Sequence, residues 1–201
     1  MKKQLLLFFV LCGCVEPQNH DDVMRIVVHV GNGAHTATAF FVGDSSIILT
    51  AKHSVIHSNT YEVYLESRVG KKDRRVSRGI DTLMLSDSAD IAIISPTQYY
   101  DNEERLELCA RDMQVGDNIT IVGYPGGDYH VSTGKVIWTD GDRFRVDAQI
   151  LCGASGAPVI LTYEWCIVGI VTLGYSSDCL KWQDAGGWTS RQIRKELEKI
   201  L

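Results

Sequence analysis

The sequence has no excess of basic residues and no hydrophobic run long enough to cross a membrane. Its 20 lysines and arginines are outnumbered by 25 aspartates and glutamates, which gives a net charge of -5. Proteins that bind nucleic acid usually carry a basic patch, so the charge argues against nucleic acid as the main partner. The apolar run at residues 5–11 is far shorter than the roughly 20 apolar residues of a spanning helix.

The first residues instead have the layout of a secretory signal peptide. Lys2 and Lys3 give a short basic start, residues 5–11 form the apolar segment, and Leu-Cys-Gly-Cys closes it at Cys14. Residues 1–13 are therefore excluded from the fold as a signal peptide. The closing tetrapeptide resembles a bacterial lipobox, which implies export and lipid anchoring through Cys14 to a bacterial membrane, facing the periplasm or the exterior. An ordinary signal peptide cut nearby is the alternative.

The remaining cysteines fit an exported protein. Once the signal peptide has left and Cys14 carries lipid, four remain, namely Cys109, Cys152, Cys166 and Cys179. An even number in an oxidising compartment predicts two disulfides, for which three pairings are open. Four buried free thiols are the alternative, because free cysteine packs as a small hydrophobic residue. A zinc site is not expected, since the cysteines are scattered and form no C-x-x-C pair.

From Met24 onward, short runs rich in Val, Ile, Phe and Tyr alternate with turn residues, which predicts strands. The predicted strands are residues 25–30, 37–42, 46–50, 61–65, 90–95, 118–123, 129–138, 143–149, 158–162 and 166–173. Many short strands at regular spacing indicate an all-β barrel or sandwich, and periodicity alone does not choose between them. The polar stretch 98–105 is expected to link an N-terminal half, residues 22–97, to a C-terminal half, residues 106–188.

The end of the chain is expected to form an α-helix over residues 189–201. Thr189 is followed three residues later by Gln192, which is a capping-box pattern. Ile193 and Leu197 then begin one apolar face at helical spacing. This would be the single helix of an otherwise all-β chain.

Three segments carry the residue types that nucleophilic catalysis needs. Thr-Ala-Lys-His ends an apolar run at His53, Ser-Ala-Asp places Asp90 before another, and Gly-Ala-Ser-Gly-Ala-Pro puts Ser155 in a tight turn. A serine hydroxyl is a weak nucleophile and needs a base within hydrogen-bond reach. That base needs a group that fixes its tautomer and stabilises its positive charge. We therefore expect His53, Asp90 and Ser155 to form a catalytic triad, with Asp87 as the alternative carboxylate.

In this order, the segments resemble the TA-x-H, D-I-A and G-x-SG-x-P motifs of the trypsin/chymotrypsin-like serine peptidases. The resemblance runs from about residue 36 to residue 173, and its details look closest to the compact bacterial branch with HtrA-type and V8-type enzymes. It implies two packed, antiparallel, six-stranded β-barrels followed by the helix. It also implies a serine endopeptidase that forms a covalent acyl-enzyme on protein or peptide substrates, without metal or organic cofactor.

The resemblance assigns further roles to backbone groups near the serine. The N–H groups of Gly153 and Ser155 would form the oxyanion hole, which binds the negative charge that develops on the substrate oxygen. Glycine is needed at position 153 because a side chain would crowd the turn. Thr172, Leu173 and Gly174 would pair with the substrate backbone as with an added β-strand.

Departures from the digestive branch of that family limit what is carried over. Ala154 replaces the aspartate that pairs there with a newly cut N-terminus, so activation by that route is not expected. Gln149 would lie near the base of the specificity pocket. No aspartate stands at that position and Val171 is not the histidine of Glu-specific relatives, so an uncharged side chain before the cut is expected. A Cys152–Cys179 bridge is suggested but not carried over directly.

The order of these residues also excludes other serine hydrolases. An α/β-hydrolase needs its histidine after the serine, whereas the last histidine here is His130, and Ala157 breaks the G-x-S-x-G pattern. Two other hypotheses stay open: a catalytically silent, membrane-anchored binding module, and an active fold that is latent until a partner or oligomer orders its oxyanion loop. The intact triad argues against the silent module.

Overall fold

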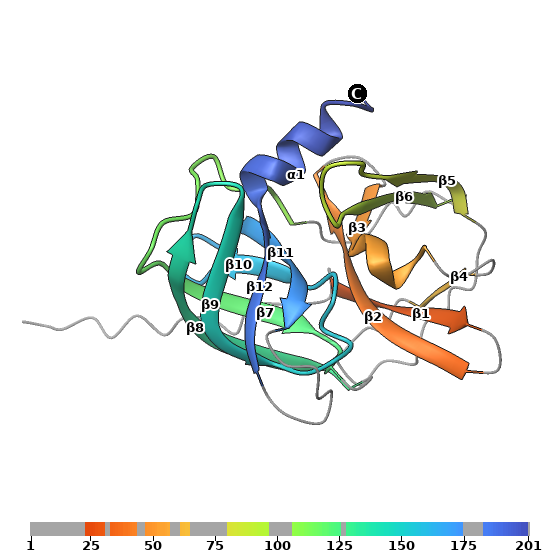
Figure 1. Cartoon of the computed structure of the whole chain (residues 1–201), viewed down its shortest axis with the longest axis horizontal. Coiled ribbons are helices and arrows are strands. Elements are labelled where there is room, and N and C mark those ends of the chain that lie inside the picture. The colour runs from red at the N-terminus through yellow and green to blue at the C-terminus, as the bar shows by residue number, and fades with distance from the viewer. Residues whose placement is uncertain are drawn as a thin grey trace, which may run out of the picture.

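The computed structural model describes most of the chain between residues 23 and 200 (Figure 1). The described ranges are 23–30, 33–43, 47–56, 61–64, 80–96, 106–125, 128–174 and 183–200. The predicted signal peptide, Cys14, Cys179 and the predicted linker 98–105 lie outside the described residues. Within the described ranges, no helix is long and apolar enough to cross a membrane.

The N-terminal half forms an antiparallel, six-stranded sheet with the strand order β4-β1-β2-β3-β6-β5. Its strands are β1 (Val23–Val30), β2 (Gly33–Val42), β3 (Ile47–Thr50), β4 (Tyr61–Tyr64), β5 (Ile80–Leu85) and β6 (Ala92–Pro96). A short 3-10 helix, η1 (Lys52–Ser54), follows β3. The end of β3 pairs with the start of β6, Thr50 opposite Ala92. This register brings η1 beside the loop that leads into β6.

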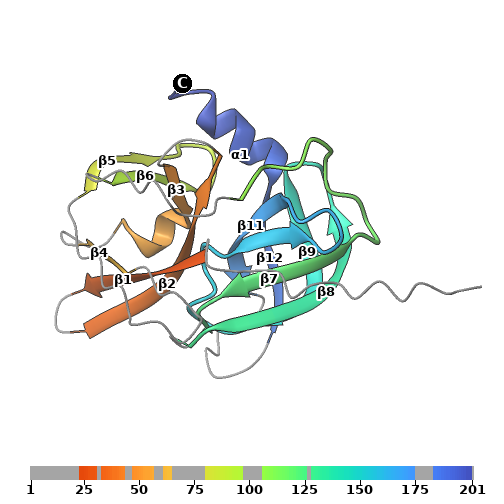
Figure 2. The same ribbon diagram turned by 180° about the vertical axis from the view of Figure 1, so that it is seen from behind.

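The C-terminal half closes into an antiparallel barrel with the strand order β10-β11-β12-β9-β8-β7. Its strands are β7 (Asn118–Gly123), β8 (His130–Thr139), β9 (Arg143–Ile150), β10 (Pro158–Leu161), β11 (Ile167–Gly174) and β12 (Gln183–Thr189). Helix α1 (Ser190–Leu197) continues directly from β12 and lies above the junction of the two halves in both views (Figures 1 and 2). The predicted all-β fold with a six-stranded C-terminal barrel and a C-terminal helix is confirmed. The N-terminal half, also predicted as a barrel, has the predicted six antiparallel strands, which form a six-stranded sheet in the described residues.

A shared hydrophobic core holds the two units together. β9 has the period-two burial pattern of a strand with one face inside a barrel, whereas β7, β10 and β11 are buried along most of their length. These three strands face the barrel interior on one side and the N-terminal unit or α1 on the other. Side chains from both units and the helix form one buried cluster there, including Phe40, Leu49, Ile91, Val122, Tyr124, Ile160, Ile170 and Ile193.

The segment that enters the C-terminal barrel is tied to both units. The Leu106 N–H donates to the Phe41 carbonyl oxygen at 3.3 Å, and the Cys109 N–H donates to the Ile167 carbonyl oxygen at 2.9 Å. A disulfide between Cys109 and Cys166 closes a loop of 57 residues. This covalent bond fixes the entry of the chain against the start of β11.

The disulfide also answers part of the question of how the cysteines pair. Cys109 and Cys166 are one of the pairs that the even count left open. Cys152 is disulfide-bonded as well. The alternative of buried free thiols is therefore wrong for these three cysteines. Because Cys179 lies outside the described residues, the Cys152–Cys179 pairing stays a prediction.

Each predicted strand overlaps a strand of the structure, but the sequence patterns miss β5 and β12. β12 contains an aspartate and two adjacent glycines, a composition that is depleted in strands. Gly187 lies so close to the Ile170 carbonyl oxygen of β11 that a side-chain carbon would collide with it. Tertiary packing, and not β-propensity, therefore makes this segment a strand.

The capping box predicted for the C-terminal helix is wrong. Thr189 precedes α1, but its hydroxyl donates to the Gly141 carbonyl oxygen at 2.6 Å and makes no cap bond. The Gln192 amide donates to Glu196 Oε1 at 2.7 Å instead of reaching back to the helix start. Both side chains thus form hydrogen bonds outside the helix cap. The helix is held in place by Ile193, which packs in the shared core.

Glu196 is a buried acid that fastens α1 to the N-terminal unit. Its side chain is 0% exposed. Oε1 accepts hydrogen bonds from Ser88 at 2.8 Å and Gln192 at 2.7 Å, and Oε2 accepts from Lys199 at 2.7 Å. Burial raises the pKa of Glu196, but the hydrogen bonds from Lys199, Ser88 and Ser86 outweigh burial and hold the pKa below its ordinary value of 4.5. The carboxylate is therefore ionised at neutral pH.

This lowered pKa predicts an acid-sensitive attachment of the helix. A group whose pKa falls on folding stabilises the native state above its unfolded pKa, and this contribution is lost as the pH falls through the lowered value. We expect Glu196→Gln to lower the free energy of unfolding by about 2 kcal/mol at pH 7, because charged hydrogen bonds are lost. The difference should shrink below about pH 4.5.

Guanidinium unfolding at several pH values measures this difference. Glu198→Gln is the matched control, because Glu198 is exposed on the same helix end. A Glu196 variant as stable as the parent at pH 7, or a difference independent of pH, would contradict this role for the carboxylate.

Candidate active site

His53, Asp90 and Ser155 lie in one hydrogen-bonded row at the junction of the two units. Nδ1 of His53 is 2.6 Å from Asp90 Oδ2, and Nε2 is 3.0 Å from Ser155 Oγ. Oδ1 of Asp90 also accepts the backbone N–H of His53 at 2.8 Å. His53 and Asp90 come from the N-terminal unit and Ser155 from the C-terminal barrel, so the row exists only where the units meet.

The histidine is delivered by the end of β3 and the short helix that follows. Ala51 is fully buried behind it, while the His53 side chain is 45% exposed. The peptide N–H of Lys52 donates to the Asp90 carbonyl oxygen at 3.3 Å, next to the bond between His53 and the carboxylate. Backbone and side-chain bonds together fix the ring relative to Asp90.

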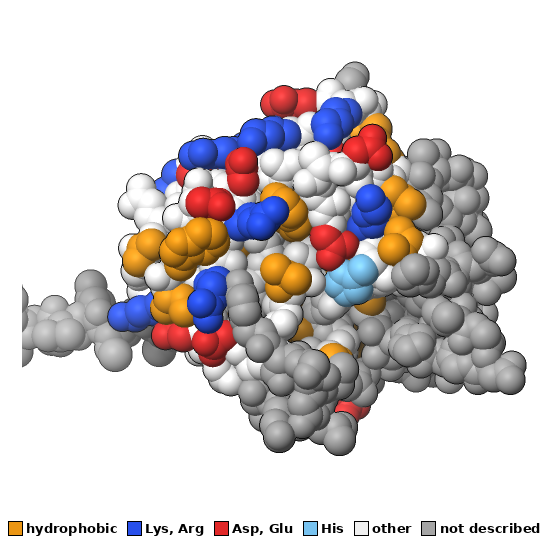
Figure 3. Space-filling view, viewed as in Figure 1, with side chains coloured by type: hydrophobic (Ala, Val, Ile, Leu, Met, Phe, Trp, Pro, Cys, Tyr) orange, Lys and Arg blue, Asp and Glu red, His pale blue; other side chains and the backbone are white. Residues whose placement is uncertain are grey.

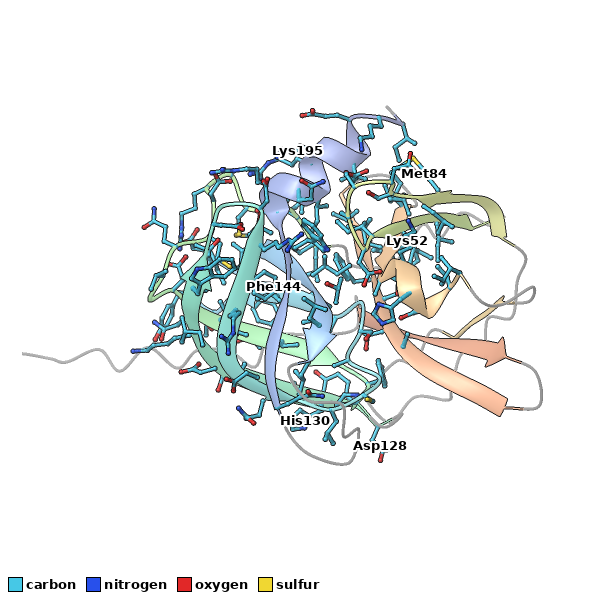
Figure 4. The ribbon with its side chains drawn as sticks, in the orientation of Figure 1. Lys52, Met84, Asp128, His130, Phe144 and Lys195 are labelled. Atoms are coloured by element: carbon cyan, nitrogen blue, oxygen red, sulfur yellow. A yellow bond between two sulfur atoms is a disulfide. The ribbon has the colours of Figure 1, made fainter. Side chains whose placement is uncertain are left out.

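The loop that carries Asp90 is held from two directions. The Ser86 hydroxyl accepts the N–H groups of Ser88 and Ala89, and the Lys52 ammonium donates to the Ser86 carbonyl oxygen at 2.6 Å (Figure 4). Glu196 holds the same loop through Ser88. The sequence motifs do not reveal the contacts of Lys52 and Glu196 with this loop, since nothing in the local sequence pairs them with residues 86–90.

The environment of Asp90 keeps its carboxylate charged. Partial burial raises its pKa, but hydrogen bonds and charge from His53, together with the charge of Lys52, outweigh burial and hold the pKa below its ordinary value of 3.8. An ionised carboxylate bonded to Nδ1 favours the tautomer with its proton on that nitrogen. Nε2 is then left as an acceptor that faces the serine hydroxyl.

The turn that carries Ser155 is shaped by two glycines with positive φ. Gly153 has φ 99° and Gly156 has φ 87°, a region that residues with a side chain rarely adopt. A side-chain carbon at Gly156 would also collide with the Thr38 carbonyl oxygen and with the hydroxyl of Thr50. The close approach of β2 thus requires glycine directly after the serine.

Thr38 of β2 is the hydrogen-bonding centre of this contact. Its N–H donates to the Ser155 carbonyl oxygen at 2.8 Å, and its hydroxyl donates to the Gly153 carbonyl oxygen at 2.8 Å. The same hydroxyl accepts the Tyr124 N–H at 3.0 Å, and the Thr50 hydroxyl donates to the Thr38 carbonyl oxygen at 2.8 Å. Thr38 is fully buried. The sequence motifs do not reveal it, because its partners in the serine turn are more than a hundred residues away.

The carbonyl bonds to Thr38 orient the peptide groups of the turn. Within the described ranges, the N–H groups of Gly153 and Ser155 donate to no other residue, whereas the N–H of Gly156 donates to the Val171 carbonyl oxygen at 2.7 Å. Two unpaired donors next to the serine hydroxyl can bind a developing oxyanion. They are the donors that the sequence resemblance named.

The predicted substrate strand continues from the same contact. Val171 exchanges hydrogen bonds with the serine turn through Gly156 and Ala157. Beyond it, β11 pairs with β12 on one side, with Leu173 opposite Gly186 and Gly174 opposite Ala185. Its pairing with β10 ends at Ile170, so the other edge of Thr172, Leu173 and Gly174 lacks a strand partner within the described ranges.

The predicted pocket residue Gln149 lies at the end of β9, beside an acid that sequence reasoning missed. Its amide donates to Asp184 Oδ1 at 2.6 Å. Asp184 belongs to β12, the strand that the sequence patterns did not predict, and sits opposite Gln149 in register. The predicted base of the specificity pocket therefore has a carboxylate beside it, which the expectation of an uncharged substrate side chain before the cut did not include.

The other candidate catalytic or metal-binding residues are not part of this hydrogen-bonded row. Asp87, the alternative carboxylate, is exposed on the loop before Asp90, and the carboxylate at His53 Nδ1 is that of Asp90. His57 lies outside the described residues. Among the described residues, no group of three or more His, Cys, Asp or Glu side chains is placed to hold a metal ion.

A family model and known proteins match both this sequence and this fold. The model for the trypsin-like peptidase domain matches residues 37–170. The sequence is 27% identical over 157 residues to glutamyl endopeptidases of Staphylococcus epidermidis, covering 70% of this chain and 55% of theirs. The chain thus spans about half the length of these relatives.

Solved structures show the same fold at low sequence identity. The active form of the Rv3671c protease of M. tuberculosis superposes with a TM-score of 0.73 at 18% identity, covering 90% of this chain and 82% of that one. A serine endoprotease from Yersinia pestis gives a TM-score of 0.74 at 18% identity, covering 90% and 63%. The HtrA-type protease AlgW gives 0.74 at 18% identity, covering 90% and 60%.

The crowding at Gly156 predicts a large penalty for a methyl group there. We expect Gly156→Ala to lower the free energy of unfolding by about 3 kcal/mol or more, because backbone strain and a collision with Thr38 add up. Gly116→Ala is the matched control: Gly116 has a similar φ of 94° but open space around it. It should cost about 1 kcal/mol. Equal losses in denaturant unfolding would show that the contact with β2 adds nothing.

Proposed function

The chain belongs to the trypsin-like peptidase family, and we propose that it is a serine endopeptidase with His53, Asp90 and Ser155 as its catalytic triad. The observation that carries the proposal is the row from Asp90 Oδ2 through both ring nitrogens of His53 to Ser155 Oγ, with contacts of 2.6 and 3.0 Å. Such a row activates a serine hydroxyl, because it places a neutral imidazole nitrogen within hydrogen-bond distance of the hydroxyl proton.

In the proposed reaction, Ser155 Oγ attacks the carbonyl carbon of the scissile peptide bond while His53 Nε2 takes the hydroxyl proton. Asp90 stabilises the imidazolium that forms. The same proton then passes from Nε2 to the leaving amine, the C–N bond breaks, and an acyl-enzyme remains. Water attacks this ester with His53 again as the base, which releases the carboxylic acid and restores the Ser155 hydroxyl.

The two donor N–H groups of Gly153 and Ser155 would stabilise the oxyanion in both steps. Loss of one such donor in other enzymes costs about 100- to 1,000-fold in turnover. Thr38 supports this arrangement, because it binds the carbonyl oxygens of Gly153 and Ser155, the two residues that carry these donors. A turn that is already held in this way favours a competent site over a latent one.

A protein or peptide substrate would bind in extended form along the open edge of β11. Thr172, Leu173 and Gly174 would supply main-chain hydrogen bonds, which give affinity without strong sequence preference. The residue before the scissile bond would point toward Gln149, where Asp184 adds a carboxylate. Neither chemistry nor binding needs a metal or an organic cofactor in this scheme.

We further propose that the protein works outside the cytoplasm. The Cys109–Cys166 disulfide supports this, because disulfides persist in oxidising compartments. The basic start and apolar segment at residues 5–11 support export, and Cys14 would carry the lipid that anchors the mature chain.

Active-site labelling tests the proposed function directly. We expect a fluorophosphonate probe to label the purified parent protein, because an activated serine attacks phosphorus as it attacks a carbonyl carbon. Ser155→Ala should keep the fold and lose the label. A folded parent that takes no label, also in the presence of membranes, would contradict an active serine and favour the silent binding module.

A second prediction separates the two candidate carboxylates. Asp90→Asn should lower kcat by about 10,000-fold, since an amide favours the wrong tautomer of His53. Asp87→Asn should leave kcat within about twofold, because exposed surface substitutions far from the reacting atoms have small effects. Peptide hydrolysis by the two variants measures both values, and a reversed pattern would transfer the role to Asp87.

A further inference from the structure

Lys52, the residue before His53, holds both ends of the loop that carries Asp90. Its peptide N–H donates to the Asp90 carbonyl oxygen at 3.3 Å, at the end of the loop. Its side-chain ammonium donates to the Ser86 carbonyl oxygen at 2.6 Å, at the start of the loop (Figure 4). One residue of η1 thus spans the loop 86–90, and it is the direct neighbour of the histidine in the chain.

The loop is closed on itself, so its place relative to η1 depends on few contacts. The Ser86 N–H donates to the Ile91 carbonyl oxygen at 3.0 Å, which closes the loop across its base. Ser86 is buried, and its hydroxyl accepts the N–H groups of Ser88 and Ala89. The loop therefore moves as a unit, and a shift at Ser86 is passed on to Asp90.

Within the described ranges, the other hydrogen bonds between η1 and this loop all meet at Asp90. They run from the N–H of Lys52 to its carbonyl oxygen, and from the N–H and Nδ1 of His53 to its carboxylate. Contacts that converge on one residue leave the loop free to pivot about that residue. The bond from Lys52 to Ser86 lies at the other end of the loop and removes this pivot. Glu196 fastens the loop to α1 and not to η1, so it does not replace this bond.

The ammonium of Lys52 acts mainly through this hydrogen bond and less through its long-range field. Burial raises the pKa of Asp90 and is the largest influence on it, the hydrogen bonds and charge of His53 lower the pKa, and the charge of Lys52 lowers it least. Figure 3 shows an acidic and a basic side chain beside a histidine on the solvent-facing surface. Water and salt screen charges there over longer distances, whereas a charged donor at hydrogen-bond distance makes a strong bond.

We propose that Lys52 is a positioning residue for the proposed reaction. Its ammonium ties the Asp90 loop to the 3-10 helix that carries His53. The carboxylate and the ring then keep one alignment while Nε2 takes the serine proton and passes it to the leaving amine. Lys52 contacts carbonyl oxygens of the loop and none of the reacting atoms, so it acts through Asp90. The inference rests on the proposed function, because it concerns turnover at that site.

Kinetics of Lys52→Met test the inference, because methionine nearly keeps the length of the side chain but removes the donor and the charge. We expect kcat for a peptide that the parent cleaves to fall by about tenfold, since a small misplacement of catalytic groups costs up to about 100-fold. KM should stay nearly unchanged, because the open edge of β11 is left intact. Lys52→Arg keeps a charged donor and should recover most of kcat.

Lys135→Met is the matched control, since Lys135 is exposed on β8 of the other unit and its loss should leave kcat unchanged. Guanidinium unfolding shows that each variant is folded under the assay conditions. If Lys52→Met does not fold, Lys52→Gln takes its place, because its side chain is shorter and stays polar. An unchanged kcat in the folded variant, or equal losses in it and in Lys52→Arg, would overturn the inference.

A double-mutant cycle shows whether Lys52 acts through Asp90. In Asp90→Asn protein the carboxylate that Lys52 aligns is already absent, so Lys52→Met should cost less than about twofold in kcat there. A residue that serves only the stability of the fold would cost the same factor in both backgrounds. Equal losses in the parent and in Asp90→Asn would therefore contradict a positioning role.

A spectroscopic measurement keeps the inference separate from the proposed function. In Ser155→Ala protein, the proton that His53 Nδ1 donates to Asp90 gives a downfield ¹H resonance, identified by its loss in Asp90→Asn. We expect Lys52→Met to broaden this resonance or shift it upfield, whereas Lys135→Met should leave it in place. A resonance that moves, while the parent neither cleaves peptide nor takes fluorophosphonate, supports alignment by Lys52 and contradicts only the proposed function. A resonance unchanged by Lys52→Met overturns the inference, whether or not the parent is active.

Discussion

The 3.0 Å contact between His53 and Ser155 joins two separately built sheets, so it depends on how closely these sheets meet. Thr38 sets that distance. Its N–H, hydroxyl and carbonyl oxygen are all used within the junction, two of them on the turn that carries Ser155. Because Gly156 lacks a side chain, β2 can approach the turn to hydrogen-bond distance. A small shift there would separate His53 from Ser155 and would also displace the N–H groups of Gly153 and Ser155.

Asp90, the carboxylate of the proposed triad, is fixed by a different set of contacts. Asp90 receives hydrogen bonds from His53, while its loop is held by Lys52 and, through Ser88, by Glu196. Buried and partly buried charges are tolerated here because each carboxylate accepts several hydrogen bonds. The polar groups around Asp90 are therefore hydrogen-bonded to one another. These bonds restrict the positions that Asp90 and its loop can adopt.

The sequence predicts what depends on local pattern. Alternating apolar residues identify most strands, and the short motifs around His53, Asp90 and Ser155 identify the row that the structure assembles. β12 is not predicted because it contains an aspartate and two adjacent glycines, and Gly187 is required there by the close contact with β11 and not by strand propensity. The contacts of Thr38 and Asp184 at the site are not predicted for a related reason. Their partners are far away in the sequence, and only strand register and tertiary packing bring them near.

The position of Glu196 in the chain has a consequence for the timing of assembly. Ser88 and Glu196 are separated by 108 residues, so a chain made from its N-terminus completes the Asp90 loop long before the acid that fastens it. Ser155 and the strand beside it also arrive late. During synthesis His53 and Asp90 thus exist before Ser155 and before the helix that anchors the Asp90 loop. The row of His53, Asp90 and Ser155 is therefore complete, and the Asp90 loop fastened, only once nearly the whole chain has been made.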